Sequence, residues 1–155
     1  MTCKPVTFDL VANLKSGIGV VQNMSNEKGI ILDLQMPTPA VITGDDNMLA
    51  TVVRNLLVNA VKYTQQGGTV TLKVKPAAAG KYIVTVSDTG IGMNAGQKNN
   101  LFRLANQPSQ RGTAGETSVG LGLIVCKDFL EKHGSTLHVE SEEGKGSRFW
   151  FEVKG

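Results

Sequence analysis

The sequence predicts an α/β fold, a two-layer α/β sandwich in which about three helices cover one face of a mixed, mostly antiparallel sheet. Helical spacing of apolar residues, from residue 10 to about 29, over 46–64 and again after 120, supports the helices. Short segments of β-type alternation between them, joined by turn-rich links, support the sheet. With 155 residues and 41% hydrophobic content the chain can bury one core, so one domain over 1–155 is expected.

The first predicted helix follows a short strand at 6–8, and Asp9 is placed to cap it. Its apolar face is formed by Val11, Leu14, Ile18 and Val21, and the pattern ends between residues 26 and 29. Two strands are expected next, at 30–36 and 41–43, because proline residues separate these two apolar segments.

The second predicted helix begins at Asp45 and Asp46, acidic residues that suit both an N-cap and the helix dipole. A wide apolar stripe then runs to Thr64: Met48, Leu49, Val52, Val53, Leu56, Leu57, Ala60 and Val61. The glycines at 67 and 68 predict a glycine C-cap. The segments 69–75 and 81–88, with a short link between them, predict a hairpin.

The last third of the chain begins with a polar run at 94–118, which is typical of a lid, a binding loop or disorder. A third helix is expected from Gly120 to about Gly134. Two strands, 135–142 and 147–153, then flank a glycine turn.

The composition disfavours several classes of protein. The net charge of +3 forms no Lys and Arg stripe with interleaved aromatics, so nucleic-acid binding is not expected. No apolar run approaches the roughly 20 residues of a membrane span, so no membrane contact is expected. Cys3 and Cys126 form no CxxC unit, and together with His133 and His138 they give no metal-ligand spacing. Two reduced thiols in a cytoplasmic protein are expected.

Three weak motifs carry the candidate chemistry. Asp88 ends a predicted strand before two glycines, so it is either a turn former or a ligand contact. Asn55 and Asn59 lie one helical turn apart, which fits a solvent-exposed face or a set of hard oxygen ligands for Mg²⁺. The segment 117–122 is either a simple helix cap or an anion site built from backbone N–H groups.

The order of these motifs resembles the catalytic ATP-binding domain of sensor histidine kinases, in the superfamily that contains gyrase, heat-shock protein 90 and MutL. The matching segments are 55–64, 88–93, 120–123 and 140–149, and the resemblance covers almost the whole chain. The resemblance implies a Bergerat-type ATP-binding fold. It also implies two-component signal transduction, in which the γ-phosphoryl group of ATP passes to a histidine.

The resemblance also implies roles for individual residues. Asp88 would accept a hydrogen bond from the adenine amino group, Gly90 and Gly92 would let the backbone close on the base, and Ile91 and Met93 would be apolar walls. Asn59 would hold Mg²⁺, Asn55 would support the metal or the phosphates, Lys62 would meet phosphate charge and Tyr63 would flank the nucleotide. Residues 94–118 would form an ATP lid that contains Phe102. The remaining implied contacts are Thr117, Ser118, Val119, Gly120, Leu121, Gly122 and Leu123.

The sequence departs from the family pattern in three ways. The phosphoacceptor histidine, which the family carries on a preceding dimerisation hairpin, has no counterpart at His133 or His138. The second of the usual lid phenylalanines is replaced by Ala105, and the usual first glycine of the glycine box is Ser118. The last two departures bear on lid closure and the transfer rate, so a catalytically inactive pseudokinase is an open alternative.

Three other functions remain as alternatives to a kinase domain. A hydrolysing ATPase of the superfamily would need a glutamate at the position of Asn55, because an amide cannot act as a general base. A non-catalytic nucleotide sensor or docking module would bind ATP without transferring phosphate. An α/β domain with incidental glycine loops would bind no nucleotide. The kinase interpretation further predicts the parent kinase's hairpin and a response regulator as partners, a cytoplasmic location, and a monomer in isolation.

Overall fold

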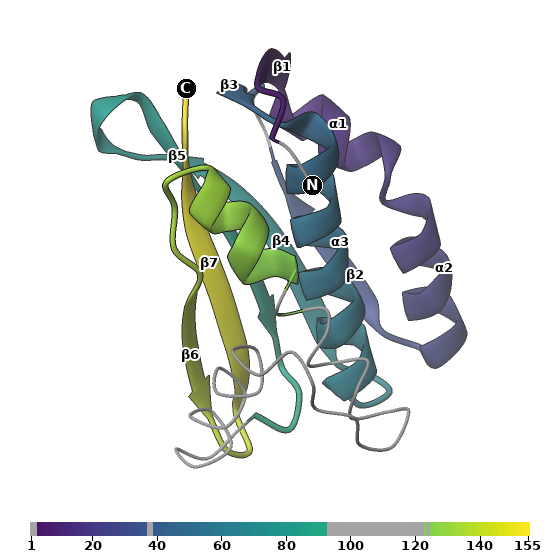
Figure 1. Ribbon diagram of the computed structural model, residues 1–155. Coiled ribbons are helices and arrows are strands. Elements are labelled where there is room, and N and C mark those ends of the chain that lie inside the picture. Colours follow the sequence, from purple (N-terminus) through teal and green to yellow (C-terminus); the bar gives the residue numbers. More distant parts are fainter. Residues whose placement is uncertain (1–2, 37–38, 93–122, 124) are drawn as a thin grey trace.

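The computed structural model describes residues 3–36, 39–92, 123 and 125–155, and Figure 1 shows the arrangement of their elements. The first half contains β1 (Val6–Asp9), α1 (Leu10–Ser16), α2 (Gly19–Lys28), β2 (Ile31–Gln35), β3 (Val41–Gly44) and α3 (Asp46–Tyr63). The second half contains β4 (Thr69–Pro76), the 3₁₀ turn η1 (Ala78–Gly80), β5 (Lys81–Asp88), β6 (His138–Glu142) and β7 (Gly146–Lys154). A helix that includes Leu123 and residues 125–132 precedes β6, and we call it the C-terminal helix.

The main sheet has the strand order β2-β4-β5-β7-β6. Strand β2 pairs with β4 in parallel, whereas the other three pairings are antiparallel. Figure 1 shows the helices gathered on one side of this sheet, which confirms the predicted two-layer α/β sandwich. The prediction of one sheet was wrong, because β1 and β3 pair antiparallel in a separate two-stranded sheet.

The first predicted helix is broken into α1 and α2, so the described residues form four helices rather than three. Gly17 ends α1: its N–H donates to the Leu14 carbonyl at 3.2 Å, the Ile18 N–H donates to the Lys15 carbonyl, and α2 begins at Gly19. Glycine has a low helix propensity, and two glycines within three positions allow the chain to change direction here. Leu14 and Val21 remain buried on either side of the break.

Helix α3 lies at the centre of the helical layer and supplies much of the core. Its predicted stripe is buried: Met48, Leu49, Val52, Val53, Leu56, Leu57, Ala60 and Val61. Asp45 caps its N-terminus by accepting the Met48 N–H at 3.0 Å and the Lys4 N–H at 2.8 Å. The bonds from the Lys4 and Met48 backbones hold the pKa of the Asp45 carboxyl below its ordinary value.

The C-terminus of α3 differs from the predicted glycine cap. Its C-cap is Thr64 in an extended conformation, with φ −97° and ψ 135°. Gly67, with φ +89°, lies in the turn that follows rather than at the cap. The last carbonyls of the helix therefore need partners from other segments.

Candidate functional site

Asp88 lies at the end of β5, the central strand of the main sheet, where it pairs in register with Val70 on one side and Ser147 on the other. The carboxylate is half-buried, and its Oδ1 accepts the Gly90 N–H at 2.8 Å. Burial raises the pKa of the Asp88 carboxyl above its ordinary value of 3.8, although backbone hydrogen bonds from Gly90 and Ser147 oppose this effect. A carboxylate with this poor hydration gains from a hydrogen-bond donor supplied by a ligand.

The glycines around Asp88 permit backbone contacts that a side chain would prevent. A Cβ at Gly90 would collide with the Tyr63 carbonyl oxygen, and it would lie 2.7 Å from Asp88 Oδ1. A Cβ at Gly92, where φ is +67°, would collide with the Glu142 carbonyl. The loop after β5 is therefore held tightly between the end of α3 and the turn that joins β6 to β7.

Hydrogen bonds hold the same loop on three sides. The Thr89 N–H donates to the Thr69 carbonyl at 3.1 Å, at the start of β4. The Ile91 N–H donates to the Tyr63 carbonyl at 3.2 Å, and the Ile91 carbonyl accepts the Gly144 N–H at 2.8 Å. The Ile91 side chain is 51% exposed, so it is available as an apolar wall.

The polar residues of α3 lie along the border of its buried stripe. Asn55 and Asn59 are half-buried, whereas Lys62 and Tyr63 are exposed, with the Lys62 ammonium 5.8 Å from the centre of the Tyr63 ring. Partial burial raises the pKa of the Tyr63 phenol. The helix thus brings Lys62 and Tyr63 to the end of the sheet where Asp88 lies.

Cys126, on the C-terminal helix, is a neighbour of Asn55 that the sequence did not indicate. The buried thiol donates a hydrogen bond to the Val52 carbonyl at 3.6 Å and also hydrogen-bonds the Asn55 side chain. Burial raises the pKa of this thiol to about 12, so it stays protonated and unreactive at neutral pH. Cys126 therefore serves packing between two helices, and Asn55 is linked to the C-terminal helix.

Several predicted site residues lie outside the described part of the chain: Met93, Phe102, Thr117, Ser118, Val119, Gly120, Leu121 and Gly122. The predicted lid at 94–118, with Ala105, also lies outside it. Leu123 is described, and its side chain is buried in the hydrophobic core with 1% exposure. Its side chain therefore packs inside the protein, and only its backbone is left for a ligand contact.

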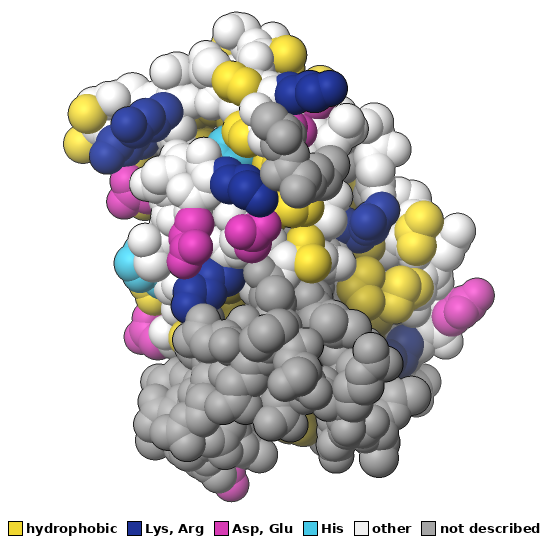
Figure 2. Space-filling view, viewed as in Figure 1, with side chains coloured by type: hydrophobic (Ala, Val, Ile, Leu, Met, Phe, Trp, Pro, Cys, Tyr) yellow, Lys and Arg dark blue, Asp and Glu magenta, His cyan; other side chains and the backbone are white. Residues whose placement is uncertain are grey.

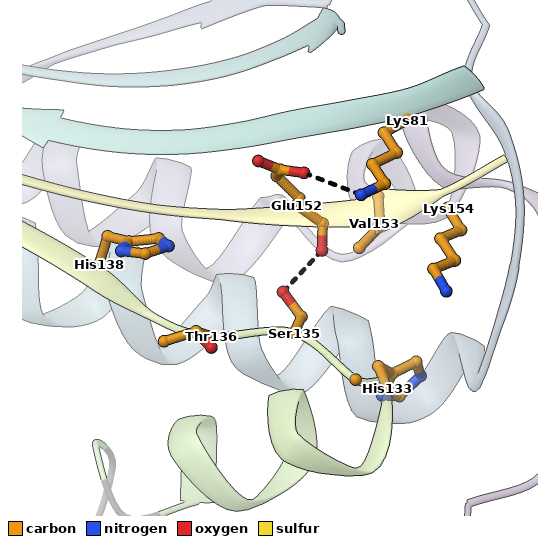
Figure 3. A pocket seen from close by; sticks show the side chains of 9 residues that line it. Lys81, His133, Ser135, Thr136, His138, Glu152, Val153 and Lys154 are labelled. Carbon is orange, nitrogen blue, oxygen red and sulfur yellow. Dashed lines mark hydrogen bonds and ion pairs between the residues drawn. The ribbon is translucent and has the colours of Figure 1, made fainter. Parts of the chain in front are cut away.

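A cavity of about 190 Å³ lies at the far end of β5 from Asp88, between β7 and the segment after the C-terminal helix (Figure 3). Its polar groups are largely engaged within the protein. Lys81 pairs with the Glu152 carboxylate at 3.6 Å, and Ser135 donates to the Glu152 carbonyl at 2.7 Å. His138 stacks on Trp150 with ring centres 5.3 Å apart. We therefore place the candidate site at Asp88 and not in this cavity.

The described side chains on the face shown in Figure 2 give little sign of a polyanion partner. On the face in Figure 2, the described Lys and Arg side chains are scattered and lie among Asp and Glu. Among the described helices, none is both long and apolar enough to cross a membrane.

Comparison with known proteins agrees with the fold and the motifs. The family model "Histidine kinase-, DNA gyrase B-, and HSP90-like ATPase" matches residues 44–155. The adaptive-response sensory kinase SasA of Synechococcus sp. (strain JA-3-3Ab) is 34% identical over 153 residues, which is 96% of this chain and 36% of that protein. The signal transduction histidine-protein kinase BarA of Escherichia coli K12 is 28% identical over 96% of this chain and 17% of its own length. The chain thus spans about a third or less of these relatives.

Solved structures share the fold. Full-length ShkA, crystallised in complex with AMPPNP, superposes with a TM-score of 0.80 at 26% identity, covering 99% of this chain and 31% of ShkA. The nucleotide-free catalytic domain of the histidine kinase ThkA also gives a TM-score of 0.80, at 21% identity, over 99% of this chain and 96% of that domain. The second structure matches this chain almost end to end.

Proposed function

Because the chain belongs to the family of histidine kinase-, DNA gyrase B- and HSP90-like ATPases, we propose that it binds ATP with Mg²⁺ and serves as the catalytic module of a sensor histidine kinase. In that role it donates the γ-phosphoryl group to a histidine on a separate dimerisation domain of the parent kinase, and a response regulator acts downstream. The observation that carries the proposal is the half-buried carboxylate of Asp88 at the end of the central strand.

Asp88 is suited to select adenine over guanine. The adenine amino group would donate a hydrogen bond to the carboxylate, which has lost part of its hydration. Guanine has a carbonyl oxygen at the same position, and this would leave the carboxylate facing another acceptor. An unpaired polar contact of this kind costs about 1–3 kcal/mol, and more where a charge is involved. The closely packed backbone at Gly90 and the exposed Ile91 would border the base.

The residues on α3 fit Mg²⁺ held mainly by the nucleotide. In the described residues, no group of three or more His, Cys, Asp or Glu side chains could hold a metal ion. The side-chain oxygen of Asn59 is a hard ligand, and Mg²⁺ commonly takes few protein ligands while substrate phosphates and water complete its shell. When bound, the ion would neutralise phosphate charge. Lys62 would add a cationic side chain close by, so this domain would act mostly by positioning and charge.

His133 and His138, the only histidines of the chain, are engaged in structural contacts. His133 Nε2 accepts the Asp45 N–H at 2.9 Å, and Nδ1 lies 2.8 Å from the Phe129 carbonyl oxygen. His138 stacks on Trp150. These contacts favour a phosphoacceptor outside this domain, as we propose.

Calorimetric titration with ATP and GTP, each with Mg²⁺, tests the proposed function. We expect ATP to bind with a dissociation constant in the micromolar range, which corresponds to a binding free energy on the order of 8 kcal/mol. GTP should bind at least tenfold more weakly. Adding a phosphoacceptor hairpin from the parent kinase should then yield phosphohistidine. Equal affinity for ATP and GTP would contradict the role of Asp88, and ATP binding without transfer would favour the non-catalytic sensor.

Asn59→Ala should weaken the affinity of the ATP complex for Mg²⁺. The substitution removes the proposed metal ligand, so we expect the Mg²⁺ concentration for half-maximal binding to rise about tenfold, which matches the loss of one ligand contact of about 1.4 kcal/mol. Asn47→Ala is the matched control, because Asn47 is exposed at the other end of the same helix. The same Mg²⁺ dependence in both variants would argue against Asn59 as the ligand.

A further inference from the structure

The end of α3 is completed by groups from three different places in the chain. The Ala60 carbonyl accepts the Thr64 hydroxyl at 2.7 Å, and the Tyr63 carbonyl accepts the Ile91 N–H at 3.2 Å. The carbonyls between them, those of Val61 and Lys62, both accept the Lys28 ammonium at 2.8 Å. The Thr64 N–H adds a longer bond of 3.4 Å to the Val61 carbonyl. All four terminal carbonyls of the helix therefore have donors, although no glycine cap is present.

Lys28 is well placed for this contact. It lies in the last turn of α2, is half-buried, and reaches across to carbonyls that are 33 and 34 positions later in the sequence. A cation at a helix C-terminus interacts favourably with the helix dipole. A charged donor also forms stronger hydrogen bonds than a neutral one. The two bonds of the Lys28 ammonium therefore restrain the last turn of α3 relative to α2.

That restrained turn is the one that holds the Asp88 loop. The Tyr63 carbonyl, next to the two carbonyls bound by Lys28, accepts the Ile91 N–H and lies against the backbone of Gly90. Gly90 in turn donates to the Asp88 carboxylate at 2.8 Å. A shift of the last helical turn would therefore move the acceptor that positions Gly90 and Ile91.

We propose that Lys28 is a positioning residue for the nucleotide site: it fixes the last turn of α3, and through the Tyr63–Ile91 hydrogen bond it fixes the loop that follows Asp88. The effect on nucleotide affinity rests on the proposed function, but the mechanical link to Ile91 does not. Lys28 touches no nucleotide in this scheme. Its action passes through the protein backbone.

The test compares Lys28→Met, which keeps an unbranched side chain but removes the charge and the donors, with Lys28→Arg, which retains both. Lys15→Met is the matched control, because Lys15 also lies in the last turn of a helix but is exposed. Two quantities are measured for each variant: hydrogen exchange of the Ile91 amide in the nucleotide-free protein, and the dissociation constant for ATP with Mg²⁺.

For Lys28→Met we expect Ile91 exchange to accelerate about tenfold and the ATP dissociation constant to rise about three- to tenfold. In Lys28→Arg, the Ile91 exchange rate and the ATP affinity should both return most of the way to the wild-type values. Lys15→Met should change neither quantity. The Val84 amide, in the middle of β5, reports general destabilisation.

Three results would overturn the inference: unchanged Ile91 exchange in Lys28→Met, equal acceleration at Ile91 and Val84, or an arginine variant no better than the methionine one. If the wild-type protein failed to bind ATP, the proposed function would fall. Exchange at Ile91 would then decide the positioning link by itself.

Discussion

Replacing Asp88 by asparagine is expected to abolish measurable ATP binding while the protein stays folded. The carboxylate accepts N–H groups from Gly90 and Ser147 and has oxygen lone pairs left for the adenine amino group. An asparagine has one oxygen acceptor, and its NH₂ group would face either a backbone N–H or the adenine amino group. The loss of a hydrogen bond to a charged group and the new donor–donor contact should weaken binding about 100-fold or more.

The stability of Asp88→Asn separates a binding defect from a folding defect. Because burial raises the pKa of the Asp88 carboxyl, the folded protein holds that proton more tightly than the unfolded chain. This carboxyl therefore favours folding least at neutral pH, and its contribution falls as the pH rises from 3.8 through the raised value. The variant lacks this titration. Its free energy of unfolding at pH 7 should stay within about 1 kcal/mol of the wild type.

Calorimetry and urea unfolding at pH 4 and pH 7 measure both properties. Asp128→Asn is the control, because Asp128 is an exposed carboxylate paired with Lys132 on the C-terminal helix. As the pH rises from 4 to 7, the wild type should lose stability relative to Asp88→Asn. Of the two variants, only Asp128→Asn should bind ATP as the wild type does. Normal ATP affinity in Asp88→Asn would refute the adenine contact.

The elements that the sequence predicted well are those with a local signal. The apolar stripe and the acidic cap of α3 depend on residues within the same helix, and the observed helix follows them from Asp46 to Tyr63. The hairpin of β4 and β5 likewise has its strands and its link in one stretch of sequence. The break between α1 and α2 also had a local signal, in Gly17 and Gly19, but the helical spacing of the apolar residues on either side concealed it.

The candidate site was predictable as a set of residues but not as a set of contacts. The motifs identified Asp88, Gly90 and the end of α3 because the resemblance to a known family marks them. The Lys28 ammonium and the Cys126 thiol were missed because their partners lie 33 or more residues away. Such contacts depend on how the helices pack, and a lysine at the end of an amphipathic helix is usually a solvent-exposed residue.

Gly146 also makes a contact with a residue far away in the sequence, Asp88. Of the substitutions proposed for this protein, Gly146→Ala is expected to lower the free energy of unfolding the most. Gly146 is buried at the start of β7, has φ +112°, and packs so closely that a Cβ would collide with the Asp88 carbonyl oxygen. Positive φ alone costs an alanine roughly 1–2 kcal/mol. Displacing the backbone of the central strand should raise the total to about 3 kcal/mol or more.

Gly144→Ala makes the comparison decisive, because Gly144 has φ +81° in the same turn but a Cβ added there would have no atom within 4 Å. The Gly144→Ala variant should therefore lose only about 1 kcal/mol of its free energy of unfolding, the part that comes from the positive φ, and its ATP affinity should not change. Gly146→Ala should lose affinity as well, since the strand end that moves carries the Asp88 carboxylate. Equal unfolding free energies for the two variants in urea would show that the close approach of β7 does not hold Asp88 in place. Unequal stabilities with equal ATP affinities would show that the contact supports the sheet and not the site.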